Sequence, residues 1–421
     1  MNSQERPNVL LVLIGSFPGD TAVANLAQRV CRGLQLNGWR PSVLSVGFSR
    51  SRAGERHDGD DARWKISYQS AYVSAVRAPL YNLLLCRRAA RMLAPMLEGH
   101  LRAGAVCAVL FLASTYCGFQ SLYELCERAG VPALSYQLEY PVLSNWTRVA
   151  TGGYFDELLH LRYTLARAAG TIGISSFWAS TAERLGVPFA VVPGYLPDEI
   201  SALAGRGEHS RPESGCFHLV TLGNWVPREC PLIVLRAVRE AYNDGIPIRY
   251  TAIGRVGGSP MERAAMRMYE GDSVLRKIVR IAGWVDEAEK EKLLESADAF
   301  VLLRRPNIET AALFPTRLPE YLAHARPVIA SSAGDLSRYL QHKKSAWLVP
   351  GGDDGTSLRA AIGELYRDRE LAHTIGRGGL ARAIESFSIE GNGKRMSEFI
   401  NSVIAGRSHG QQVTATTYSA V

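Results

Sequence analysis

Residues Phe314–Ser331, FPTRLPEYLAHARPVIAS, carry the most information about the fold of this chain. The stretch predicts a loop, a short helix and then a buried strand. Thr316 is expected to cap the helix, and Pro319 falls in its first turn, where a missing N–H group costs little. The apolar run Pro327–Ala330 is typical of a parallel strand that is buried on both faces.

The apolar residues of the short helix recur at helical spacing. Leu318, Tyr321 and Leu322 are expected to face the core, which leaves the helix N-terminus exposed with free backbone N–H groups. Arg317 and Glu320 flank that end. Because a helix N-terminus attracts anions, we expect Arg317 to hold a phosphate and Glu320 to accept hydrogen bonds from a ribose diol.

The same residues carry a resemblance to a known enzyme family. The stretch is similar to the donor-binding signature of retaining glycosyltransferases of family four, in which the segment F-P-x-K-x-x-E-Y-x-A-x-G-x-P-V-I-A wraps the nucleotide diphosphate of a sugar donor. The fitting positions are Phe314, Pro315, Arg317, Glu320, Tyr321, Ala323, Pro327, Val328, Ile329 and Ala330, with Arg317 in place of lysine. In the older form of the signature a first glutamate contacts the sugar, and Ala312 stands there in this chain.

The order of the expected strands and helices predicts two α/β halves. The first half opens with a strand at Val9–Ile14, a turn that holds Gly15 and Gly19, a helix, and a second strand at Pro41–Val46. This is the start of a doubly wound sheet. By the resemblance, the glycine-containing loop faces the donor phosphates and the acceptor. The second half is expected to start with a strand at Phe217–Leu222.

We therefore expect an α/β protein of GT-B architecture, with two Rossmann-like doubly wound domains facing a cleft. The expected parts are an N-terminal acceptor-binding domain, a polar linker, a C-terminal nucleotide-sugar-binding domain, a helix crossing back to the first domain and a disordered tail. Their ranges are 1–200, 201–215, 216–385, 386–405 and 406–421. Residues 357–405 are expected to be helical.

Composition is that of an ordinary globular protein. The chain has 421 residues, of which 47% are hydrophobic and 21% charged, and this length suggests two or three domains. No apolar run reaches about 18 residues, so no spanning helix is expected, and the first residues do not have the features of a signal peptide. Seven cysteines without CxxC pairs indicate reduced thiols and a cytoplasmic location.

The net charge of +8 favours an anionic partner. No helix-turn-helix, zinc-finger or RNP signature is present, so nucleic acid is the weakest candidate. The basic amphipathic segment Leu80–Arg102 suits contact with a membrane surface. It also suits an ordinary domain helix with an arginine-rich exposed side. A peripheral membrane contact therefore stays open.

Two turns resemble further donor contacts of the family. Residues Ile281–Val285 resemble the turn whose backbone reads the nucleotide base. There Gly283 allows close approach, and Trp284 either stacks or lies in the core. Residues Leu222–Pro231 stand where the family has G-R-x-x-x-x-K-G, whose arginine and lysine neutralise the diphosphate.

This chain departs from the second of these turns. Its glycine is Gly223, but Asn224 and Glu229 replace the arginine and the lysine. A bound diphosphate needs positive charge in a low-dielectric site, so other arginines have to supply it. The candidates are Arg228, Arg317, Arg304 and Arg305. For Arg304 and Arg305 a solvated surface position is equally consistent with the sequence.

In the N-terminal half, Glu139 follows the expected strand Ala133–Tyr136. It is the one ionisable side chain of its loop, and strand ends are where functional groups gather in such sheets. A surface glutamate beside a proline turn is the alternative. His160, on a predicted helix, is the next candidate, although a lone helical histidine is more often structural. Ser175 and Ser176 are expected to cap the following helix.

The sequence thus predicts a glycosyltransferase that moves a hexosyl-type sugar from a nucleotide-diphospho sugar to a glycan or lipid-linked acceptor, with retention and without a metal or other cofactor. Such a reaction serves bacterial surface polysaccharide or glycoconjugate synthesis. The expected catalytic residues are Glu139 and Arg317. The expected nucleotide-sugar-binding residues are Gly19, Gly223, Asn224, Arg228, Gly283, Trp284, Pro315, Thr316, Arg317, Leu318 and Glu320. The alternatives are a non-catalytic nucleotide-sugar-binding protein and a nucleotide-sugar epimerase, both of GT-B fold.

Overall fold

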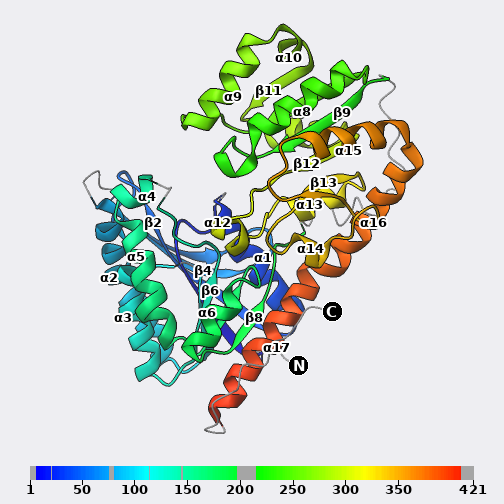
Figure 1. Ribbon diagram of the computed structural model, residues 1–421. Coiled ribbons are helices and arrows are strands. Elements are labelled where there is room, and N and C mark those ends of the chain that lie inside the picture. The colour runs from blue at the N-terminus through cyan, green and yellow to red at the C-terminus, as the bar shows by residue number, and fades with distance from the viewer. Residues whose placement is uncertain are drawn as a thin grey trace. The chain divides into compact units, whose positions relative to one another are not determined.

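The computed structural model describes residues 6–19, 21–74, 80–112, 114–143, 146–196 and 215–408. By its internal contacts the chain forms two compact units, which are Met1–Tyr195 with Ile389–Val421, and Leu196–Ser388. Each unit has a mostly parallel sheet with helices packed on it (Figure 1). The predicted α/β class with two Rossmann-like domains is confirmed. The expected linker up to residue 214 and the expected tail beyond Ser408 lie outside the described residues.

The sheet of the first unit has eight strands in the order β3-β4-β2-β1-β5-β6-β7-β8. Only β3 and β4 pair antiparallel. Neither strand was expected, and β3 gives no sequence signal, since it is exposed along its whole length and has no apolar residue. The strands are β1 Asn8–Ile14, β2 Arg40–Phe48, β3 Arg56–Asp60, β4 Ser67–Val73, β5 Val106–Phe111, β6 Ala133–Gln137, β7 Gly170–Gly173 and β8 Phe189–Val191.

Helices α2 and α3 pack on the sheet face that presents Leu10 and Val12. Ser175 and Ser176 do not cap α6 as predicted. Its N-cap is Phe177, and no side chain caps it, since a backbone turn from Ala179 to the Ser176 carbonyl leads into the helix. The helices of this unit are α1 Ala22–Leu36, α2 Tyr81–Arg102, α3 Tyr116–Arg128, α4 Trp146–Ala150, α5 Gly153–Leu159, a π-helix His160–Thr164, a 3-10 turn Leu165–Arg167, α6 Trp178–Leu185 and α17 Ile389–Ser408.

The last helix, α17, packs along α1 within the first unit. Glycines make the approach possible, because a Cβ added to Gly33 would lie 2.9 Å from the Cα of Gly393. Trp39 Nε1 donates to Ser397 Oγ at 2.7 Å and fixes the helix further along. Residues far apart in sequence therefore build one core in this unit.

The sheet of the second unit has six parallel strands in the order β11-β10-β9-β12-β13-β14. The strand order reverses between β9 and β12, which makes that place a topological switch point. The strands are β9 Phe217–Leu222, β10 Ile248–Ile253, β11 Val279–Gly283, β12 Ala299–Leu302, β13 Val328–Ser332 and β14 Trp347–Pro350.

The expected helical stretch at 357–405 is helical, but it is divided into α15, α16 and α17 at Asp368 and Ser388. Among the described residues, no helix has both the length and the apolar character that crossing a membrane requires. The helices of the second unit are a 3-10 turn Pro227–Glu229, α8 Pro231–Asn243, α9 Pro260–Gly271, α10 Ser273–Ile278, α11 Glu287–Glu295, α12 Ile308–Ala312, α13 Leu318–Ala323, α14 Leu336–Tyr339, α15 Thr356–Arg367 and α16 Arg369–Phe387.

Candidate functional site

The candidate site of the second unit lies at the carboxyl ends of β9 and β12, where the strand order reverses. Open α/β sheets bind ligands at such a point because the loops on its two sides diverge. Gly223 follows β9, Arg304 follows β12, and Arg317 precedes α13. The fold thus gathers three residues that are far apart in the sequence.

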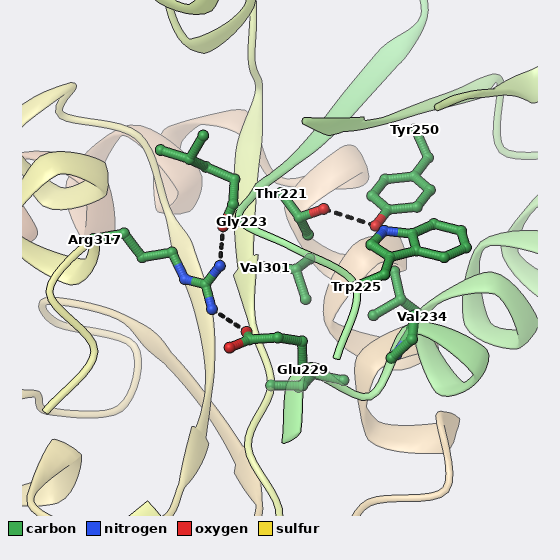
Figure 2. A pocket seen from close by; sticks show the side chains of 11 residues that line it. Thr221, Gly223, Trp225, Glu229, Val234, Tyr250, Val301 and Arg317 are labelled. Carbon is green, nitrogen blue, oxygen red and sulfur yellow. Dashed lines mark hydrogen bonds and ion pairs between the residues drawn. The ribbon is translucent and has the colours of Figure 1, made fainter. Parts of the chain in front are cut away.

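Arg317 is largely buried, with its side chain 15% exposed. Its guanidinium donates to the Leu222 carbonyl and forms an ion pair with Glu229 (Figure 2). Gly223 permits this packing, because its φ is +121° and a Cβ there would overlap Nη1 of Arg317. A carboxylate partner, Glu229, thus holds the Arg317 side chain inside the unit.

Thr316 does not cap α13. The N-cap residue is Arg317, and no side chain caps the helix. A backbone turn starts the coil, since Leu318 N donates to the Pro315 carbonyl at 2.8 Å, and Thr316 is left exposed. The predicted core positions Leu318, Tyr321 and Leu322 are all buried.

Glu229 is surrounded by three arginines, Arg228, Arg304 and Arg317, which we call the arginine cluster. Besides its ion pair with Arg317, its Oε1 lies 3.0 Å from Arg304 Nη2 and 3.6 Å from Arg228 Nε. Glu309 adds a second carboxylate, 2.8 Å from Arg228 Nη1. Two of the arginines proposed from the sequence, Arg228 and Arg304, therefore do lie beside Arg317.

Burial and mutual repulsion set the charge state of the arginine cluster. Burial lowers the pKa of Arg304 to about 10, and the charges of Arg317 and Arg228 act in the same direction against the attraction of Glu229. Burial also opposes the charge of Arg317, but Glu229, together with Tyr321 and Tyr250, outweighs it and raises the pKa of Arg317. The guanidiniums of Arg304 and Arg317 are therefore charged at neutral pH, and the cluster attracts anions.

Glu320, the residue expected to bind ribose, points its carboxylate at Lys290 of α11, with 2.9 Å between Oε1 and Nζ. Burial disfavours the charge of Lys290, but Glu320 and Glu287 outweigh it and raise the pKa of Lys290. The Glu320 side chain is 13% exposed. Lys290 thus holds the Glu320 carboxylate in a fixed orientation, which sequence reasoning did not predict.

The expected base-reading turn sits at the end of β11. Gly283 has φ of +69°, and its carbonyl accepts from Gly254 N at 2.8 Å. Trp284 is 78% exposed, so the alternative that it lies in the core is wrong. The Arg255 guanidinium lies 5.4 Å from its ring centroid, and Arg255 N donates to Asn224 Oδ1 at 3.0 Å. The exposed indole is therefore available for stacking.

A small cavity of about 20 Å³ lies beside the Arg317–Glu229 pair. Thr221 Oγ1 and Tyr250 Oη are 2.7 Å apart on its wall (Figure 2). That volume holds about one water molecule. No ligand group of the size of a phosphate fits the cavity in this arrangement of side chains.

In the first unit, Glu139 follows β6 and is half exposed, with Arg148 Nη1 at 3.1 Å from its Oε2. The same Arg148 nitrogen lies 3.0 Å from Oε1 of Glu157. Burial raises the pKa of Glu157 to about 7, and Glu139 and Asp156 add to the rise against the effect of Arg148. Glu139 therefore belongs to a polar group with a second carboxyl that is buried and easily protonated.

His160 is fully buried at the start of the π-helix. Its Nε2 lies 3.2 Å from Gln137 Nε2 at the end of β6. Burial lowers the pKa of His160 to about 4, so the ring is neutral at physiological pH. A buried, neutral ring of this kind agrees with a structural role for His160 rather than a catalytic one.

The structure thus brings Gly223, Arg228 and Arg317 together around Glu229, and Pro315 and Leu318 stand beside Arg317 in the chain. Gly19 lies in the first unit, in the turn after β1, where a Cβ would be 3.2 Å from the Ser16 carbonyl oxygen. Sequence reasoning missed Lys290 and Glu157. Glu157 lies 9 residues from Arg148, and Lys290 lies 30 residues from Glu320, and no local pattern signals such pairs.

Residues 217–368 match the family described as Glycosyl transferases group 1. These residues include the whole site of the second unit, and for them the predicted resemblance is confirmed. The chain spans about half the length of the first two curated relatives that it matches. It is 24% identical over 211 residues to WcaL of Escherichia coli K12, which is named as a glycosyltransferase of colanic acid biosynthesis, covering 48% of this chain and 50% of WcaL.

A further relative is AmsK of Erwinia amylovora, an amylovoran biosynthesis glycosyltransferase, at 28% identity over 125 residues and 29% of each chain. Among solved structures, HepE of Anabaena in complex with UDP-glucose superposes with a TM-score of 0.62 at 15% identity, over 94% of this chain and 99% of HepE. Sucrose-phosphate synthase of Thermosynechococcus elongatus superposes with a TM-score of 0.64 at 16% identity, over 95% of this chain and 100% of the synthase chain. The fold is GT-B, as predicted.

Proposed function

We propose that this protein is a glycosyltransferase that takes a hexosyl-type sugar from a nucleotide-diphospho sugar in the synthesis of a polysaccharide or related glycoconjugate. One observation carries the proposal. Three arginines from separate elements converge at the switch point of the second sheet, inside the segment that matches the glycosyltransferase family. Convergent guanidiniums suit a diphosphate, because each presents a planar fork of donors to phosphate oxygens.

The roles of the residues follow from their chemistry. The arginine cluster binds the diphosphate and stabilises the negative charge that grows on it as the sugar leaves. The carboxylate of Glu320 accepts the ribose hydroxyls, held in place by Lys290. The turn at Gly283 and Trp284 receives the base. With positive charge supplied by side chains, we propose that transfer proceeds without a metal.

The acceptor belongs to the first unit in this proposal. The pair Glu139 and Glu157, joined through Arg148, offers carboxylate oxygens to sugar hydroxyls of a glycan or lipid-linked acceptor. We carry over retention of the anomeric configuration from the resemblance of the motif at Phe314–Ser331.

A peripheral membrane contact is part of the proposal for a lipid-linked acceptor. Helix α2 exposes Leu84, Arg87, Arg88 and Arg91 at helical spacing, a pattern that suits anionic lipid headgroups. Sedimentation with vesicles of phosphatidylcholine, with and without phosphatidylglycerol, tests it. Binding only to the anionic vesicles, lost when the three arginines are changed to serine, is the expected result, and equal sedimentation with both vesicle types would remove the contact.

A second candidate function has an observation in its favour. Asn224 and Glu229 stand where the resemblance expects arginine and lysine, which suits a protein that binds a nucleotide sugar without transferring it. The deciding experiment is to incubate the protein with UDP-glucose and other common nucleotide sugars, with and without glycan acceptors. Acceptor-dependent release of nucleoside diphosphate supports the transferase, conversion without acceptor supports an epimerase, and binding without turnover supports the binding protein.

A further inference from the structure

The arginine cluster is already occupied by an anion, and that anion is a side chain of the protein. Both carboxylate oxygens of Glu229 face guanidiniums, Oε2 toward Arg317 and Oε1 toward Arg304 and Arg228. The Glu229 side chain is 14% exposed. A carboxylate with two oxygens between forked cations has the same complementarity as a bound phosphate.

Glu229 leaves part of the cluster unfilled. The Nε groups of Arg304 and Arg228 are buried and have no hydrogen-bond partner in the part of the chain that the structure describes. The Arg304 side chain is only 8% exposed, so water does not readily replace the missing partner. A diphosphate has more oxygens than one carboxylate and is able to satisfy these donors as well.

The cluster cannot hold both anions as it stands. The adjoining cavity of about 20 Å³ has room for about one water molecule, and two anions against the same guanidiniums repel each other. The turn that carries Glu229 also holds its position at a conformational cost, since the next residue, Cys230, has φ of +51° without being glycine.

We propose that Glu229 is a specificity-determining residue of the donor site. Its carboxylate occupies the arginine cluster until a phosphate-bearing ligand displaces it. This rests on the proposed function, because it takes the cluster as the diphosphate site. A ligand without phosphate cannot displace Glu229 and gains nothing from the cluster, so the residue separates nucleotide sugars from free nucleosides and neutral sugars. When the nucleoside diphosphate product leaves, Glu229 returns and competes against its rebinding.

The affinity of a phosphate ligand is reduced by the fraction of time that Glu229 occupies the cluster. Removing the carboxylate removes this competition. Glu229→Gln should therefore bind inorganic pyrophosphate and UDP roughly 10- to 100-fold more tightly than the wild type. Uridine, which has no phosphate, should bind both proteins equally. The matched control is Glu309→Gln, because the ion pair that Glu309 makes among the described residues is with Arg228; its effect should be less than about threefold.

The test is calorimetric titration of the full chain and the two variants with inorganic pyrophosphate, UDP and uridine. Glu229→Asp is a second variant that keeps the charge but shortens the reach, and it decides the matter if Glu229→Gln does not fold; it too should bind pyrophosphate more tightly. Weaker or equal binding by the Glu229 variants would overturn the inference and make Glu229 a residue that positions the arginines. If no protein binds pyrophosphate or any of UDP, GDP, ADP and TDP, the proposed function itself fails.

Discussion

Replacing Gly223 by alanine tests directly how Arg317 is held. Gly223 has φ of +121°, and a Cβ there would overlap Nη1 of Arg317 and lie 3.0 Å from its Cζ. The guanidinium would have to move, although it is buried and bonded to the Leu222 carbonyl and the Glu229 carboxylate. The substitution therefore acts on the arginine cluster without changing any charged residue.

Two costs add at Gly223. A side chain in a sparsely populated backbone region costs about 1–3 kcal/mol, and the lost hydrogen bonds of a charged group cost about 1.5–3 kcal/mol. We expect Gly223→Ala to lower the free energy of unfolding by about 3–5 kcal/mol. Gly245→Ala is the matched control, because Gly245 has φ of +81° with nothing within 4 Å of its Cβ position, so it bears the backbone cost alone.

The free energies come from urea unfolding followed by circular dichroism, and the same proteins are titrated with pyrophosphate. Gly223→Ala should lose more stability than Gly245→Ala and should bind pyrophosphate at least about tenfold more weakly, since Arg317 is displaced. Equal losses of stability in the two variants, with binding intact, would refute the role given to Gly223.

Three further variants test other parts of the structure. Burial raises the pKa of Glu157 from 4.5 to about 7, so its contribution to stability is fully present below pH 4.5 and is lost as the pH rises through 7. As the pH rises from 4.5 to above 7, the free energy of unfolding measured in urea should fall by up to about 3 kcal/mol more for the wild type than for Glu157→Gln. Gly33→Ala should lower the melting temperature and reduce the free energy of unfolding by about 1–3 kcal/mol, because the added Cβ would meet α17. The control Gly99→Ala, on α2 with open space around its Cβ position, should lower neither. Glu320→Ala should weaken the binding of UDP and of uridine equally, by about 1–3 kcal/mol in calorimetry, since both ligands carry the ribose. Weaker binding of UDP alone would place Glu320 near the phosphates instead.

The sequence was most informative where an element is defined by its own residues. The apolar run after Pro327 predicted the strand that forms at Val328–Ser332, because a strand buried on both faces needs continuous apolar residues. Strand β3 has no such signal. It pairs with β4 at the edge of the sheet, and its side chains are exposed, so neither alternation nor apolar content marked it.

The site was predictable in its parts but not in its pairings. The motif at Phe314–Ser331 identified Arg317 and Glu320 without reference to the rest of the chain. Their partners are Glu229, 88 residues from Arg317, and Lys290, 30 residues from Glu320. Such contacts depend on strand order at the switch point, which local patterns do not encode. One signal was present, since Glu229 and Arg317 both depart from the lysines of the family pattern.

The central claim is that the arginine cluster binds the diphosphate of a nucleotide. The most direct test is calorimetric titration of the wild type, Arg317→Ala and the control Arg280→Ala with UDP, GDP, ADP and TDP and with the corresponding nucleosides, after circular dichroism shows that all three are folded. Arg280 serves as the control because its side chain is 54% exposed and pairs with Glu289. We predict that one diphosphate binds the wild type and the control alike and binds Arg317→Ala at least about tenfold more weakly, while its nucleoside binds all three equally. No binding of any diphosphate to the wild type, or equal losses of nucleoside and diphosphate in Arg317→Ala, would contradict the claim.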